Sequence, residues 1–127
     1  MNKLLGLILA LIVLPLAQAV ALDRSERTLA GIVYFTNNTP PDLDQFPVEL
    51  FTKDQRKRVA ATTLDAHGRF ALTGLKPGQY RVKFTWLPDR CTLWYRVDLR
   101  EASKTGAKVI MDAACGNPHP LSDLPEN

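Results

Sequence analysis

The chain has 127 residues, 46% of them hydrophobic, and a formal net charge of +3 at pH 7. Its 16 basic and 13 acidic residues give no nucleic-acid signal, because proteins that bind nucleic acid concentrate basic side chains far more strongly. The length allows a single domain with one hydrophobic core.

Residues 1–19 are predicted to be a secretory signal peptide. Lys3 supplies a positive charge, residues 4–16 are almost continuously apolar, and Ala17-Gln18-Ala19 forms a small-x-small cleavage pattern. The apolar run is shorter than the roughly 20 residues that a membrane-spanning helix needs. We therefore expect cleavage after Ala19, no transmembrane anchor, and a periplasmic or secreted location.

The rest of the chain is expected to form seven strands and no helix. Short apolar runs that alternate with Gly-, Pro-, Asn- and Asp-rich turns are typical of a β-sandwich or barrel. The tail 116–127 contains three prolines and no apolar periodicity, which predicts an extended or flexible segment. The predicted strand ranges are 29–35, 46–52, 58–64, 69–72, 79–86, 93–99 and 107–113.

The segment from Thr63 to Val82 carries the most specific pattern. It places tight turns at Asp65–Gly68 and Lys76–Gly78, between strands whose aromatic and aliphatic residues alternate with polar ones. This pattern resembles the carboxypeptidase regulatory-like domain, a transthyretin-like β-sandwich that is also close to CnaB-type surface modules. The resemblance implies an all-β, seven-stranded, transthyretin-like (prealbumin-like) sandwich over residues 27–115, preceded by a short lead at 20–26. It implies no function by itself, because one fold hosts many functions.

Two cysteines, Cys91 and Cys115, are expected to form a disulfide, because disulfides persist in exported proteins. A metal or redox pair is the alternative, but the spacing is not CxxC and no histidine lies near both cysteines. Closing this loop is expected to contribute roughly 3–4 kcal/mol. A hairpin between residues 93–99 and 107–113 would align the cysteines in one register, with the pairs Val97–Val109, Tyr95–Met111, Leu93–Ala113 and Asp98–Lys108.

No catalytic residue, metal site or cofactor is expected. The two histidines, His67 and His119, lie outside any HExxH spacing, and no G-x-S-x-G motif occurs. Transthyretin-like hydroxyisourate hydrolases use histidines and a tyrosine-arginine-glycine-serine tail, which this chain lacks. CnaB-type modules form an isopeptide from a first-strand lysine, and residues 29–35 contain none. We therefore expect that the protein is not an enzyme.

The outward positions of the predicted strands form a candidate binding surface. An exposed tryptophan flanked by arginines can stack on a sugar ring or anchor a protein partner. The alternative is that this tryptophan packs under a loop or against the cysteine pair. The candidate residues are Trp94, Arg96, Arg81, Lys83 and Phe51.

Two functional hypotheses follow. The first is a non-catalytic binding or assembly module of the cell envelope, whose partner is an envelope protein or a glycan. The second is a small secreted inhibitor or immunity-like protein that inserts the proline-stiffened loop Asn37–Gln45 into an enzyme. A basic turn, Lys53–Arg58, is either solvated surface or a contact for an anionic partner.

Overall fold

The computed structural model describes residues 25–36, 42–86, 91–111 and 120–126. These residues form eight strands and one turn of 3-10 helix. The elements are β1 (Arg27–Phe35), η2 (Leu43–Gln45), β2 (Pro47–Thr52), β3 (Arg58–Thr63), β4 (Arg69–Leu75), β5 (Gln79–Trp86), β6 (Cys91–Asp98), β7 (Lys104–Met111) and β8 (Ser122–Asp123).

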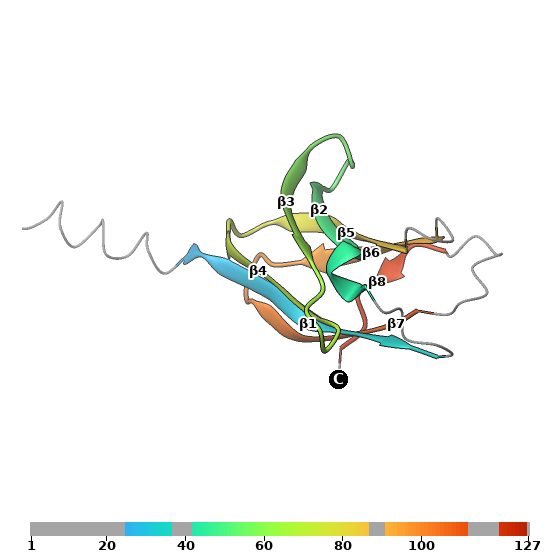
Figure 1. The fold of residues 1–127 in the computed structure, drawn as a ribbon. Helices are drawn as coiled ribbons and strands as arrows, with labels where there is room; N and C mark the ends of the chain where they lie inside the picture. Colours follow the sequence, from blue (N-terminus) through green and yellow to red (C-terminus); the bar gives the residue numbers. More distant parts are fainter. Residues whose placement is uncertain (1–24, 37–41, 87–90, 112–119, 127) are drawn as a thin grey trace, which may run out of the picture.

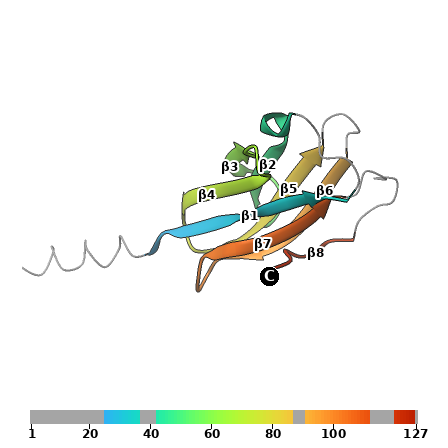
Figure 2. The ribbon, with the colours of Figure 1, turned by 60° about the horizontal axis from the view of Figure 1, so that its bottom comes forward.

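The strands form two sheets that pack face to face as a β-sandwich (Figures 1 and 2). The smaller sheet has the order β4-β1-β7, and the larger has the order β3-β2-β5-β6-β8. Strand β1 runs parallel to β7 and antiparallel to β4. The predicted all-β sandwich is thus confirmed, although the described residues hold eight strands where the sequence predicted seven.

Alternation of apolar and polar residues places one face of each strand in the core, as expected for half-buried strands. Phe84 of β5 is 0% exposed and makes edge-to-face contacts with two rings. Its ring centroid lies 5.3 Å from that of Phe70 in the other sheet and 6.0 Å from that of Tyr95 on β6. These aromatic contacts join the two sheets at the centre of the sandwich.

The predicted turn at Asp65–Gly68 is present and connects β3 to β4. Gly68 has a φ of 77°, a conformation that residues with a side chain rarely adopt. The Asp65 carboxylate accepts hydrogen bonds from the backbone N–H groups of His67 (2.8 Å) and Arg69 (2.9 Å). These bonds, that from Arg69 foremost, lower the pKa of Asp65 below its ordinary value. The side chain of His67 is exposed in this turn.

Gly31 allows β1 to approach β7 closely. A Cβ atom at this position would lie 2.4 Å from the carbonyl oxygen of Ala107 and 2.6 Å from its Cβ. Because backbone would have to move, we expect Gly31→Ala to reduce the free energy of unfolding by about 1–3 kcal/mol, measured by urea denaturation. Gly106→Ala on the neighbouring strand β7 is the control, since nothing lies within 4 Å of its added Cβ. Equal urea midpoints for the two variants would contradict this packing.

The predicted hairpin between residues 93–99 and 107–113 is wrong. Strand β6 pairs with β5 and β8, whereas β7 pairs with β1 in the other sheet. The residues between them carry the chain from one sheet to the other. Apolar side chains of β6 and β7 therefore meet across the core. Each strand has alternating buried and exposed residues, as it would in a hairpin. The proposed charge pair is also absent, since Asp98 pairs with Arg100 at 2.8 Å and Lys108 lies over the Tyr34 ring.

Cys91 lies in the core, 5% exposed, and its sulfur is 3.9 Å from the sulfur of Met111 at the end of β7. Among the described residues there is no free thiol. Cys115 lies outside the described residues, so the predicted disulfide with Cys115 remains a prediction. The sulfur contact brings Cys91 beside the strand that leads, four residues later, to Cys115.

Residues 120–126 differ from the flexible tail that the sequence predicted. Strand β8 pairs with β6, and the Leu124 side chain is 7% exposed. The Leu124 N–H donates to the Arg96 carbonyl at 2.9 Å, and the Lys108 N–H donates to the Pro125 carbonyl at 2.9 Å. This segment therefore contacts both sheets along one edge of the sandwich. A single buried leucine and backbone hydrogen bonds hold it, and neither gives a periodic signal in the sequence.

Candidate functional site

The five residues of the predicted binding surface all lie on the outer face of the larger sheet. Strand β5 runs between β2 and β6, and its register places Lys83 opposite Trp94 and Arg81 opposite Arg96. On its other side, Arg81 lies opposite Phe51 of β2. The structure thus brings the five residues onto three adjacent strands; their role as a binding site remains a prediction.

Phe51 and Trp94 form an aromatic pair on this outer face. Their ring centroids are 5.2 Å apart with an interplanar angle of 54°, so the rings meet above β5. The Lys83 ammonium lies 5.6 Å from the centroid of the Trp94 ring, within the range of a cation–π contact. Trp94 is half-buried, and its ring contacts that of Phe51. The pair offers an amphipathic aromatic surface to a ligand.

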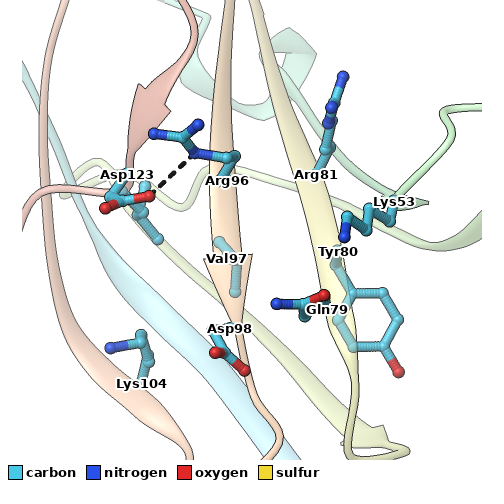
Figure 3. A pocket seen from close by; sticks show the side chains of 10 residues that line it. Lys53, Gln79, Tyr80, Arg81, Arg96, Val97, Asp98, Lys104 and Asp123 are labelled. Atoms are coloured by element: carbon cyan, nitrogen blue, oxygen red, sulfur yellow. Dashed lines mark hydrogen bonds and ion pairs between the residues drawn. The ribbon is translucent and has the colours of Figure 1, made fainter.

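A polar pocket of about 370 Å³ adjoins this pair where β5 begins and β6 ends (Figure 3). Arg96 lies between Asp123 on one side and Arg81 on the other, in the order of the strands β8, β6 and β5 (Figure 3). The Arg96 guanidinium donates to the Asp123 carboxylate at 3.0 Å. The pocket is lined by Lys53, Gln79, Tyr80, Arg81, Arg96, Val97, Asp98, Lys104, Asp123 and Leu124.

The other charged groups around this pocket are largely paired. The Arg100 side chain hydrogen-bonds Asp98 and lowers the pKa of this carboxyl to about 2. The Lys104 ammonium lies 3.3 Å from a Glu126 carboxylate oxygen. Asp98 and Glu126 are each paired with a cation, so neither supplies a free carboxylate to the pocket.

Arg81 differs from Arg96 and Lys104 because it has no carboxylate partner among the described residues. Its Nε atom is buried without a hydrogen-bond partner, an arrangement that costs about 1–3 kcal/mol for a buried donor. Arg81 also lies directly opposite Arg96, and like charges in opposed positions destabilise a sheet. Two arginines therefore lie side by side on this face, and of the two only Arg96 has a carboxylate partner among the described residues.

A second, more open hollow of about 580 Å³ lies beside the β2–β3 turn and shares Lys53 and Arg81 with the first. Here Thr52 donates to Asp54 at 2.6 Å, and this bond is the main reason that the pKa of Asp54 is lowered. Arg58 of the predicted basic turn is paired with Glu49 at 3.2 Å and does not line the hollow. The hollow is lined by Thr52, Lys53, Asp54, Arg56, Lys57 and Arg81.

Several pocket residues were missed by the sequence reasoning. Gln79 and Asp98 share the outward parity of Arg81 and Arg96 and could have been included on that signal. Asp123 gave no signal, because it reaches the pocket only through the pairing of β8 with β6.

The predicted inhibitory loop Asn37–Gln45 is only partly within the described residues. Residues 42–45 form the end of the loop, in which η2 buries the Leu43 side chain to 7% exposure. Residues 37–41, the signal segment and His119 lie outside the described residues. In the part of the chain that the structure describes, no three His, Cys, Asp or Glu side chains gather as a metal site, and no helix is long and apolar enough to cross a membrane.

No protein-family profile matches the sequence, and a search among curated proteins gives no match. The structure is similar to the Bacillus anthracis TIE protein, with a TM-score of 0.53 and 17% identity over 68% of this chain. This chain spans only 16% of the length of that protein.

Two further solved structures are more distant. One is a Pseudomonas aeruginosa protein to which carbohydrate binding has been ascribed, with a TM-score of 0.45 and 16% identity over 69% of this chain and 88% of that one. The other is the major pilin subunit of Bacillus cereus, with a TM-score of 0.42 and 21% identity over 69% of this chain and 28% of that one. At 17% identity the likeness to the TIE protein shows the fold alone, a β-sandwich.

Proposed function

We propose that this protein is a non-catalytic binding module that recognises a carbohydrate through the outer face of its larger sheet. The observation that carries this proposal is the Phe51–Trp94 pair, with ring centroids 5.2 Å apart, beside a polar pocket of about 370 Å³. A sugar ring has apolar C–H faces and a rim of hydroxyl groups. The aromatic pair supplies a surface for the ring faces, and the pocket supplies donors and acceptors for the hydroxyls.

A glycan fits this face better than a protein does. The centres of protein–protein interfaces are depleted of lysine, aspartate and glutamate. Around the aromatic pair, in contrast, Lys83 lies over the Trp94 ring and the pocket is lined by Lys53, Asp98 and Lys104. A protein partner would have to desolvate these charges, whereas a glycan can hydrogen-bond them directly and through water.

We test this proposal with Trp94→Ala on an array of neutral and acidic oligosaccharides. The variant is expected to lose at least tenfold in affinity for the glycans that the unmodified protein binds. Its stability is expected to fall by about 1–3 kcal/mol, because the half-buried ring loses both its aromatic pair and part of its buried area. Tyr34→Ala is the matched control, because Tyr34 is a 43% exposed aromatic residue of β1 in the other sheet.

Unchanged glycan binding by Trp94→Ala would contradict the proposed site. Global unfolding of this variant would instead assign Trp94 to the packing of the sandwich. Equal losses in Trp94→Ala and Tyr34→Ala would show that the binding does not depend on the outer face of the larger sheet.

We also propose that the protein acts in the periplasm or outside the cell as a carboxypeptidase regulatory-like module. The signal-peptide pattern of residues 1–19 and the resemblance of residues 27–115 support this setting. The Cys91–Cys115 disulfide belongs to the same proposal, and the contact of Cys91 with Met111 supports it. Such a module contributes binding, so the partner or substrate-acting protein supplies any catalytic activity.

A further inference from the structure

We infer that the glycan is acidic, and that an oxyanion on its sugar, a carboxylate or a sulfate, is bound by Arg81 together with Lys53. This inference rests on the proposed function and names the class of ligand for the same face. It follows from the charges around the two hollows, from the position of Arg81, and from the connection of the hollows to each other.

The two hollows contain cations that no carboxylate compensates. In the described part of the chain, Lys53, Lys57 and Arg81 make no ion pair. The nearby acids are occupied, because Asp123 pairs with Arg96 at 3.0 Å, Asp98 with Arg100 at 2.8 Å and Asp54 with Arg56 at 3.8 Å. An anionic ligand therefore meets free positive charge at Arg81 and Lys53.

Arg81 is the residue best placed to bind the oxyanion. It lies on the central strand β5, next to Phe51 on one side and Arg96 on the other, and it lines both hollows. Its Nε donor is buried and has no partner, but the side chain as a whole is partly exposed, so the oxyanion would meet the two terminal Nη groups. A planar guanidinium binds carboxylate and sulfate oxygens through two parallel hydrogen bonds. A ring stacked on Phe51 and Trp94 would place an acidic substituent within reach of this group.

The Asp123 carboxylate shows how one arginine of the pocket is neutralised. Asp123 reaches Arg96 from β8 and forms one hydrogen bond to its guanidinium. Arg81 occupies the equivalent outward position on β5, directly opposite Arg96, but has no such acid. The ligand oxyanion would thus do for Arg81 what Asp123 does for Arg96.

The shared residues Lys53 and Arg81 connect the polar pocket to the hollow beside the β2–β3 turn. There Lys57 adds a further positive charge, whereas Arg56 is paired with Asp54 at 3.8 Å. A single small anion needs only one of these positions. Cations distributed over two adjoining hollows fit a polymer that carries an oxyanion on successive sugars. The expected ligand is therefore an acidic polysaccharide, bound along its chain.

The experiment compares four polymers: polygalacturonate, its carboxyl-reduced neutral form, dextran sulfate and dextran. We expect measurable affinity for polygalacturonate, for dextran sulfate, or for both, and at least tenfold weaker binding of the matching neutral polymer. Polygalacturonate alone assigns the site to carboxylates, and dextran sulfate alone assigns it to sulfates. Affinity is also expected to fall as salt rises from about 50 to about 300 mM, because the Debye length shortens and exposed charges attract each other less.

Arg81→Gln is expected to weaken binding to the acidic polymer at least tenfold, and the exposed Lys53→Gln is a second variant that leaves the sheet intact. Lys108→Gln removes the same charge from β7 in the other sheet and is expected to bind as the unmodified protein does. Equal affinity for acidic and neutral polymers, or equal losses in Arg81→Gln and Lys108→Gln, would overturn the acidic ligand and leave glycan binding in place. Binding to none of these polymers and to no glycan of the array would contradict the proposed function itself.

Discussion

Phe84→Ala is expected to lower the free energy of unfolding by about 3–5 kcal/mol, the range for removing a fully buried aromatic ring. Phe84 is 0% exposed and packs against Phe70 of the other sheet at 5.3 Å and against Tyr95 at 6.0 Å. Its loss therefore leaves a cavity at the centre of the sandwich, between the sheets. Chemical denaturation in urea, followed by tryptophan fluorescence, measures the effect.

The control for this substitution is Val59→Ala, because Val59 is 41% exposed and surface changes of this kind usually stay within about 0.5 kcal/mol. Small domains have only about 5–15 kcal/mol of total stability, so Phe84→Leu provides a milder variant that keeps the domain folded. Similar urea midpoints for Phe84→Ala and Val59→Ala would show that Phe84 is not at the centre of the core.

Loss of the proposed Cys91–Cys115 disulfide is expected to reduce stability by roughly 3–4 kcal/mol, because the bond closes a loop of about 25 residues in the unfolded chain. Two comparisons measure this: the oxidised protein before and after reduction, and the unmodified protein against the Cys91→Ser, Cys115→Ser double variant. Both should shift the urea midpoint downward by the same amount. The buried position of Cys91, 3.9 Å from the Met111 sulfur, makes the reduced thiol inaccessible until the domain opens.

Mass spectrometry of the exported protein after alkylation under denaturing, non-reducing conditions supplies the control. The proposal expects no alkylated cysteine before reduction and two after it. Alkylation of both cysteines without reduction, or an unchanged urea midpoint after reduction, would contradict the disulfide.

The strands were predictable because their signal is local. The alternation in Gln79–Trp86 gave β5 with its bounds unchanged, and each other predicted strand differed by one to three residues at one end or both. A half-buried strand imposes this alternation on the sequence whatever its neighbours are. Turn chemistry was equally local, since the Asp65 carboxylate caps its own turn through the N–H groups of His67 and Arg69.

The choice of partner strands was not predictable in the same way. Strands β6 and β7 face each other across the core, and their inward residues alternate as they would in a hairpin. Only the connection between them differs: in a hairpin it stays within one sheet, and here it crosses from one sheet to the other. The same difficulty hid β8, because its pairing with β6 depends on backbone hydrogen bonds and on one buried side chain, Leu124.

The sequence predicted which residues of the candidate site share one face of the sheet, but not which of its charged residues are paired. Outward parity placed Arg81 and Lys83 of β5 with Trp94 and Arg96 of β6, since these strands are joined in sequence and adjacent in the sheet. The pairing of charges depends on contacts that are distant in the chain. The Arg96–Asp123 ion pair joins residues that lie 27 positions apart in the chain. The sequence therefore could not show that Arg96 has a carboxylate partner and that Arg81 has none.

The most direct test of the proposed site is an NMR titration of the ¹⁵N-labelled protein with a short oligogalacturonate. We expect the largest shift changes in the Trp94 indole N–H, the Arg81 Nε–H and the backbone of the turn that contains Lys53. We expect little change in the smaller sheet, with Lys108 as the marker. Changes confined to the smaller sheet, or an unchanged Arg81 signal under saturation of the protein, would contradict the assignment of this face as the ligand-binding site.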